Sequence, residues 1–224
     1  MQEVKFTKKI FLFLMLILTG LLGLEKMSPV HAQTMYWEDP VSLTNKDSRF
    51  PVTVTNGQDS YLLWEEVDSA SKQIYLSIRK YSSLTEYEDH QRFAGPFSYS
   101  GDEVPDIFSA AIMADGKLAV AAASEYGQIQ VFSSINKGET FEQSSLQGSS
   151  IMVAPRIYAT KAGGFKMFTS VGEENTFTIY TADSSDGKSW SRFTAFQPAV
   201  NYRNPFIPVL VQTESGDMVV FQAQ

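Results

Sequence analysis

The chain has 224 residues, 43% of them hydrophobic and 13% aromatic, and a formal net charge of -7 at pH 7. This apolar content excludes a disordered chain, because disordered chains lack the side chains needed to bury a core. The sequence contains no cysteine, which excludes disulfides, thiolate metal sites and cysteine nucleophiles. The acidic excess argues against nucleic-acid binding, since contacts with a phosphate backbone need a basic surplus.

The first 32 residues have the pattern of a secretory signal peptide. Lysines near the start precede an uncharged apolar run over residues 10–24, and the small residue Ala32 stands before the expected cleavage point. A helix of about 15 residues spans roughly 22 Å, less than the ~30 Å hydrocarbon core of a bilayer. We therefore expect residues 1–32 to be removed and residues 33–224 to be exported to the periplasm, the cell surface or the medium, without a stable membrane span. An uncleaved membrane anchor is the alternative.

From residue 33 onward, short apolar runs with a period of two alternate with clusters of Gly, Asn, Asp and Ser. This pattern predicts β-strands joined by turns. The strands that we expect cover residues 34–43, 61–64, 74–78, 117–120, 129–132, 177–180 and 218–221.

Equivalent positions recur about every fifty residues, which indicates an internal repeat. Aromatic residues that open a strand stand at Trp37, Phe93, Phe141 and Trp190, and the following strand begins at Pro51, Phe108, Pro155 and Pro208. Short strands in groups of four, repeated at this spacing, predict an all-β fold made of four-stranded antiparallel β-propeller blades. A β-sandwich would explain the strands but not the repeat.

Two turns carry closely similar motifs at the same phase of this repeat. Residues 134–141 read Ser-Ile-Asn-Lys-Gly-Glu-Thr-Phe, and residues 184–190 read Ser-Ser-Asp-Gly-Lys-Ser-Trp. Asn or Asp caps backbone N–H groups, Gly adopts a positive φ, and the aromatic ring fills the blade. The motifs resemble the Asp-box of sialidase-like (bacterial neuraminidase repeat) propellers. The resemblance implies structural roles for Ser134, Asn136, Gly138, Phe141, Ser184, Asp186, Gly187 and Trp190.

In the resembled family, these boxes join the third and fourth strands of a blade, opposite the active site. That family binds the carboxylate of its sugar with three arginines, and it uses an Asp acid/base with a Tyr–Glu nucleophile. The segment Ser48-Arg49-Phe50-Pro51 resembles the Arg-Ile-Pro motif of the family, which implies a catalytic and substrate-binding role for Arg49. Asp68 lies near the place of the acid/base. Val67 stands where a second arginine belongs, which speaks against catalysis.

The loops at the end opposite the boxes are rich in carboxylates, tyrosines and arginines, and we expect them to line a ligand site. The expected loop between the second and third strands contains Glu65 and Glu66. The residues predicted to bind substrate, besides Arg49, are Glu66, Tyr126, Tyr202 and Arg203. Ordinary solvated or ion-paired loop residues are the alternative for each of them.

The sequence therefore predicts an exported protein that binds glycans or glycoconjugates, as a degenerate or truncated exo-glycosidase. A non-enzymatic scaffold that binds protein through the same surface is the alternative. We predict no metal, no cofactor and no nucleic-acid partner. The repeat amounts to about 3.5 to 4 blades, from which we expect a chain that is incomplete at its C-terminus and part of a ring of about six blades. A compact ring of about four blades is the alternative.

Overall fold

The computed structural model describes residues 46–81, 90–124, 128–146, 152–173, 176–196, 200–201, 209–213 and 215–220. The chain divides into two compact units, residues 1–43 and 44–224, and every described residue belongs to the second. The described residues form strands and turns and contain no helix. Accordingly, no helix that could span a membrane occurs in these ranges. The expected signal peptide and the expected strand over residues 34–43 lie outside the described residues.

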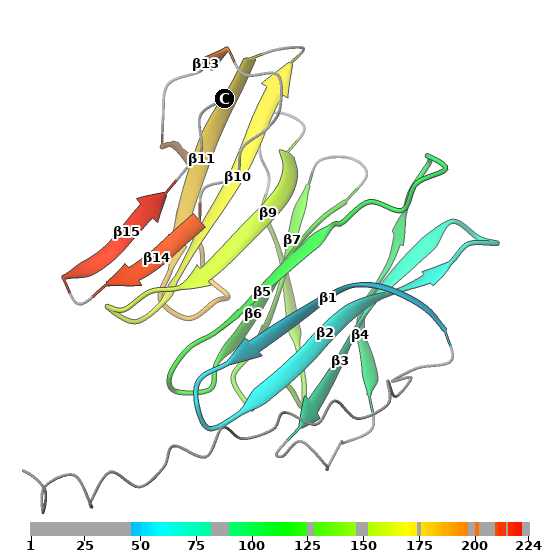
Figure 1. The fold of residues 1–224 in the computed structure, drawn as a ribbon, viewed down its shortest axis with the longest axis horizontal. Helices are drawn as coiled ribbons and strands as arrows, with labels where there is room; N and C mark the ends of the chain where they lie inside the picture. The colour runs from blue at the N-terminus through cyan, green and yellow to red at the C-terminus, as the bar shows by residue number, and fades with distance from the viewer. Residues whose placement is uncertain are drawn as a thin grey trace, which may run out of the picture. The chain divides into compact units, whose positions relative to one another are not determined.

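Three antiparallel sheets follow one another along the chain (Figure 1). In each of them, four strands that are consecutive in the sequence lie side by side in the same order. The first contains β1 (Asp47–Thr55), β2 (Ser60–Asp68), β3 (Gln73–Tyr81) and β4 (Gln91–Ser98). The second contains β5 (Phe108–Ile112), β6 (Leu118–Ala123), β7 (Ile129–Ser134) and β8 (Glu142–Leu146). The third contains β9 (Met152–Ala159), β10 (Phe165–Glu173), β11 (Thr176–Ser184) and β12 (Thr194–Ala195), and β13 (Val200–Asn201) also pairs with β11. A hairpin of β14 (Val209–Thr213) and β15 (Gly216–Val220) follows.

The second sheet packs against its neighbours through both of its faces. On β6, Leu118, Val120 and Ala122 belong to a core cluster shared with the first sheet. The intervening Ala119 and Ala121 belong to a second cluster shared with the third sheet. Successive residues of a strand point to opposite faces, so β6 contributes to both clusters. Because the β6 side chains are small or β-branched in most positions, a sheet can pack closely on each face.

The first strands of the three sheets are also neighbours, because β1 contacts β5 and β5 contacts β9. Consecutive antiparallel sheets that pack face to face, with their first strands adjacent, are β-propeller blades. The predicted all-β fold of four-stranded blades is thereby confirmed, and the hairpin β14–β15 is two strands of a further sheet within the described residues.

Aromatic residues stand near the start of the fourth strands, as the repeat predicted, and they also connect adjacent sheets. Phe93 of β4 stacks on Phe141, which directly precedes β8, with ring centroids 4.2 Å apart. Trp190 precedes β12 and packs against the cluster between the second and third sheets. The fourth repeat position, Trp37, lies outside the described residues.

Candidate functional site

Arg49 lies near the start of β1, at the end of the first sheet opposite the hairpin turn that joins β1 to β2. The pairing of β1 with β2 shifts between Arg49 and Val52, and Phe50 within this bulge has a φ of 50°. Bulges redirect the side chains around them. The Arg49 guanidinium donates to both carboxylate oxygens of Asp47, at 3.2 and 3.1 Å, and the side chain is 44% exposed. This pair raises the pKa of Arg49, so the group stays cationic.

Glu65 stands directly opposite Arg49 in the β1–β2 ladder. It is fully buried, and its Oε1 accepts a 2.9 Å hydrogen bond from the backbone N–H of Ile107, just before β5. Its Oε2 is buried without a hydrogen-bond partner among the described residues. Burial raises the pKa of Glu65 to about 7, with a further contribution from the charge of Asp106. The carboxyl group therefore changes its protonation near neutral pH.

The charged groups continue from the first sheet to the third. Asp106, the neighbour of Ile107, accepts a 3.0 Å hydrogen bond from Nη2 of Arg156 on β9. Nη1 of Arg156 also contacts the carbonyl oxygens of Phe108 and Pro155. Arg49 on β1, Glu65 on β2, Asp106 before β5 and Arg156 on β9 thus form a row from the first sheet to the third, which we call the rim cluster. Guanidinium donors lie at both ends of this row and carboxyl groups lie between them, a combination suited to a ligand with many hydroxyl or carboxylate groups.

Glu66 lies on the other face of β2 from Glu65, because successive strand residues point to opposite faces. It is 1% exposed. Its carboxylate accepts hydrogen bonds from Nε of Arg92 at 2.6 Å and from Oγ of Ser77 at 2.9 Å, and Nε2 of His90 lies 3.2 Å away. Burial acts to raise the pKa of Glu66, but these groups outweigh burial and hold the pKa below its usual range. The expected location of Glu65 and Glu66 in a loop was wrong, since both lie within β2.

Asp68 ends β2 and is exposed. Its Oδ1 accepts hydrogen bonds from the backbone N–H groups of Ala70 and Ser71, at 3.1 and 3.3 Å. Hydrogen bonds from Ser71 hold the pKa of Asp68 below its usual range. In this geometry the side chain stabilises the turn from β2 to β3. The remaining predicted ligand residues, Tyr126, Tyr202 and Arg203, lie outside the described residues.

The turn over residues 134–141 joins β7 to β8, the third and fourth strands of the second sheet. Oγ of Ser134 donates to Oδ1 of Asn136 at 2.9 Å and accepts the N–H of Gly138 at 2.9 Å. Oδ1 of Asn136 also accepts the N–H of Thr140. Gly138 has a φ of 80°, a conformation that glycine adopts at little cost.

The turn over residues 184–190 repeats this arrangement between β11 and β12. Oγ of Ser184 donates to Oδ1 of Asp186 and accepts the N–H of Gly187, whose φ is 79°. Oδ1 of Asp186 accepts the N–H groups of Lys188 and Ser189, each at 2.8 Å. These backbone donors, that of Ser189 foremost, hold the pKa of Asp186 below its usual range. The two turns are therefore built alike and lie at the end of each sheet away from the rim cluster.

The predictions from sequence missed Arg156 altogether and placed Glu65 in a loop. The alternation of side chains along the strand indicated that Glu65 is buried. Tyr61, Leu63 and Val67 occupy alternate positions on the same face as Glu65, and all three are buried. Arg156 follows Pro155 inside an expected strand, and its partner Asp106 is 50 residues away in the sequence. Among the described residues, no group of three or more metal-ligating side chains could hold a metal ion.

No protein-family model matches this sequence, and no curated protein matches it either. Similar solved structures include a GH43 endo-arabinanase from Bacillus licheniformis, with a TM-score of 0.47 and 14% identity over 75% of this chain and 65% of that one. The GH93 α-L-arabinofuranosidase of Fusarium graminearum has a TM-score of 0.45 and 14% identity, over 74% of this chain and 52% of that one. Trypanosoma rangeli sialidase, solved with sialic acid, has a TM-score of 0.43 and 13% identity, over 78% of this chain and 33% of that one. This chain therefore spans less than two thirds of each of these proteins, all of which are named as glycosidases.

Proposed function

We propose that this chain is an exported, sialidase-like Asp-box propeller protein that binds glycans through the rim cluster. Export rests on the signal-peptide pattern of residues 1–32. The family rests on the motifs of the 134–141 and 184–190 turns, whose Ser, Asn or Asp, and Gly residues make matching hydrogen bonds.

The observation that carries the glycan proposal is the row of partly exposed charged groups across three blades. Arg49 and Asp47 have side chains 44% and 42% exposed, and Arg156 and Asp106 have side chains 31% and 36% exposed. Guanidinium groups donate to hydroxyl or carboxylate oxygens of a sugar, while carboxylates accept from its hydroxyl groups. A ligand that crosses the first strands of the blades would meet both kinds of group.

Glu65, which is buried opposite Arg49, supports the proposed role of the rim cluster in glycan binding. Because its pKa lies near 7, the carboxyl group is substantially protonated at neutral pH and adds less negative charge to the rim cluster. The guanidinium of Arg49 then pairs with Asp47 and can also donate to a ligand. The same feature makes ligand binding dependent on pH, with an anionic ligand held better below pH 7 than above it.

The test is a calorimetric titration of the full chain with 3'-sialyllactose and, separately, with lactose. We expect binding of at least one of them, and a dissociation constant raised about tenfold in Arg49→Gln and in Arg156→Gln, because each variant removes a charge-assisted hydrogen bond. Arg192→Gln is the matched control, since Arg192 is an exposed arginine near the 184–190 turn. The proposal fails if neither sugar binds, or if both rim variants bind as well as the control.

Hydrolysis is tested separately with a fluorogenic sialoside. If the unaltered chain releases the fluorophore and the Arg49→Ala variant does not, the proposal extends to catalysis. A lack of turnover together with intact binding restricts the proposal to glycan recognition.

A further inference from the structure

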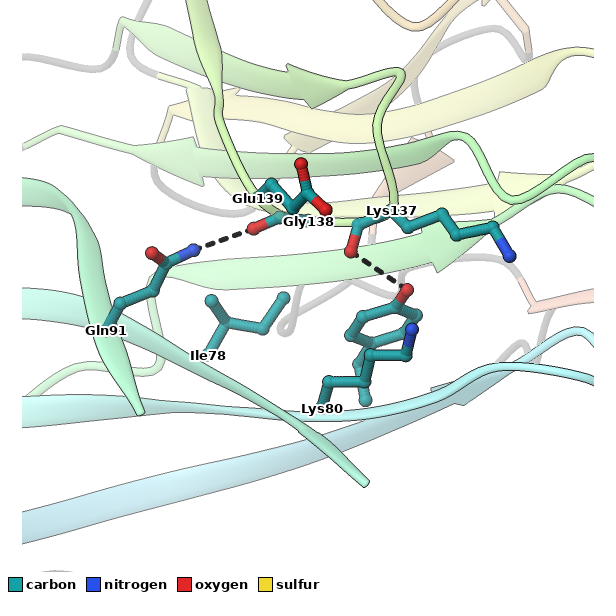
Figure 2. Close-up of a pocket in the computed structure, with 7 residues that line it drawn as sticks. Ile78, Lys80, Gln91, Lys137, Gly138 and Glu139 are labelled. Carbon is teal, nitrogen blue, oxygen red and sulfur yellow. Dashed lines mark hydrogen bonds between the residues drawn. The ribbon is translucent and has the colours of Figure 1, made fainter. Parts of the chain in front are cut away.

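A pocket of about 330 Å³ lies at the other end of the first two sheets, beside the 134–141 turn (Figure 2). The first sheet contributes side chains of β2, β3 and β4, and the turn contributes three consecutive residues. The lining residues are Tyr61, Ile78, Lys80, Gln91, Lys137, Gly138 and Glu139. Its volume falls at the lower end of the range of small-molecule sites in proteins.

Two hydrogen bonds fasten the turn to the first sheet and so give the pocket a defined wall. Oη of Tyr61 donates to the carbonyl of Lys137 at 3.0 Å, and Nε2 of Gln91 donates to the carbonyl of Gly138 at 2.7 Å (Figure 2). Lys137 and Gly138 have φ values of 58° and 80°, and both of their carbonyls accept hydrogen bonds from the first sheet. A Cβ on Gly138 would lie only 3.3 Å from atoms of Leu118 and Tyr61, so this position tolerates no side chain without rearrangement.

One side of the pocket carries two ammonium groups held by a single carboxylate. Nζ of Lys80 and Nζ of Lys137 each lie 3.1 Å from a different oxygen of Asp59. Hydrogen bonds from Lys137 and then Lys80 hold the pKa of Asp59 below its usual range, so Asp59 stays anionic and the three groups together carry a single positive charge. Each ammonium has three donors, which leaves donors for a ligand after the bond to Asp59.

Gln91 lies on the other side of the pocket in the same view, away from both ammonium groups, with Glu139 between the two sides (Figure 2). The amide oxygen of Gln91 and the carboxylate of Glu139 are hydrogen-bond acceptors. The ring of Tyr61 and the side chain of Ile78 add apolar surface among these polar groups. The pocket therefore offers cationic donors on one side and neutral or anionic acceptors on the other.

The turn itself does not require these polar groups. At the next junction, a Cβ added to the corresponding Gly187 would lie 3.2 Å from the methyl group of Ala119 and 3.1 Å from the ring of Phe165, so the turn packs closely on apolar groups there. Ala119 belongs to the preceding sheet there, as Tyr61 does at the first junction. Apolar contacts are thus enough to seat such a turn on its neighbour, and the two lysines at the first junction, which bond Asp59 and not the turn, call for another explanation.

We propose that this pocket is a second saccharide site, which binds a single sugar residue bearing a carboxylate. The carboxylate lies against the ammonium groups of Lys80 and Lys137, and the ring hydroxyls donate to Gln91 and Glu139. The site lies away from the rim cluster and does not depend on the function proposed for it.

The test measures dissociation constants of the full chain by NMR titration with methyl β-D-glucuronide, methyl β-D-glucoside and acetate as separate probes. We expect the glucuronide to bind at least about tenfold more tightly than either of the other two, because only it satisfies both sides of the pocket. Lys80→Gln and Lys137→Gln should each weaken glucuronide binding by about tenfold. Lys137 is 55% exposed and Lys80 26% exposed, so Lys137→Gln is the variant less prone to affect folding.

Lys166→Gln is the matched control, because Lys166 is also 26% exposed and also pairs with an aspartate, Asp183. It should bind the glucuronide as the unaltered chain does. Equal affinity for acetate would identify a simple anion site and overturn the proposal, as would equal affinity for the glucoside, an absence of binding, or lysine variants that match the control. Arg49→Gln should leave glucuronide binding here unchanged, so that failure of the rim proposal and failure of this one are distinguished.

Discussion

The hydroxyl of Tyr61 on β2 donates a 3.0 Å hydrogen bond to the carbonyl of Lys137, which lies 76 residues further along the chain. This bond joins the first sheet to the turn of the second. The Tyr61 side chain is also among the largest fully buried side chains of the described residues. The same residue therefore contributes its ring to the core and its hydroxyl to the junction between two blades.

Replacement of Tyr61 by Phe should lower the free energy of unfolding by about 1 kcal/mol, because it removes this hydrogen bond and leaves the ring in place. Urea denaturation measures the effect. Tyr75→Phe is the control, since the hydroxyl of Tyr75 bonds Gln73 within the first sheet and connects no second sheet. A Tyr61→Phe variant as stable as the unaltered chain would show that the bond contributes nothing to the junction.

Gly187→Ala should destabilise the chain more than Gly163→Ala does. Both glycines have a positive φ, 79° and 87°, so both variants bear the cost of an alanine in a left-handed conformation, about 1 kcal/mol. A Cβ at position 187 would also meet Phe165 and Ala119 at 3.1 and 3.2 Å, whereas one at position 163 meets nothing within 4 Å. We expect Gly187→Ala to lower the free energy of unfolding by about 2–3 kcal/mol in total. Thermal unfolding of the two variants gives the comparison, and equal losses would contradict the tight packing of the 184–190 turn.

The free energy of unfolding should fall as pH rises toward and through 7, because of Glu65. Its pKa is raised from 4.5 to about 7 in the folded chain, so the folded state holds a proton there that the unfolded state releases. Between these values the folded state binds more protons, and raising the pH destabilises it by up to about 3 kcal/mol. Glu65→Gln removes the titrating group, so the stability of the unaltered chain relative to this variant should be greatest below pH 4.5, fall as pH rises, and reach its lowest value above pH 7. A difference between the two that is independent of pH would contradict the burial of this carboxyl group.

Glu66 should show the opposite dependence on pH. Its pKa is lowered in the folded chain, where Arg92 and Ser77 donate to the carboxylate. Its contribution to stability is therefore present above the ordinary value of 4.5 and is lost as pH falls through the lower, folded pKa. Glu66→Gln should lower the free energy of unfolding by about 2 kcal/mol at pH 7, the loss expected for hydrogen bonds to a charged group. In acid the variant should lower it by less. Urea denaturation across this range, with the Glu65 variant in parallel, tests whether adjacent residues of one strand titrate with opposite effects on stability.

The sequence predicted the repeat well because each blade uses the same local devices. The expected strands over residues 61–64, 74–78 and 129–132 all lie within β2, β3 and β7. The 134–141 and 184–190 turns also join the strands that their position in the repeat indicated. Period-two patterns and turns that need glycine are local features, and one chain segment suffices to display them.

The rim cluster was harder to predict because its contacts join different blades. The Asp106–Arg156 pair and the bond from Ile107 to Glu65 depend on how the first strands of neighbouring sheets align. The bulge at Arg49 also extends β1 four residues before Pro51, where the strand was expected to start. Glu65 was expected in the loop between the second and third strands, although its position on the face of Tyr61 and Leu63 indicated burial.

The contact of Gly138 and Gly187 with the sheet before each of them has a consequence for protein engineering. Lengthening either turn would push two sheets apart, so foreign peptides should not be inserted there. The segment that joins β2 to β3 is a better insertion point, because Ser69, Ala70 and Ser71 are all exposed. A peptide displayed at this position would extend from the ends of the two central strands of one sheet and leave the spacing between sheets unchanged.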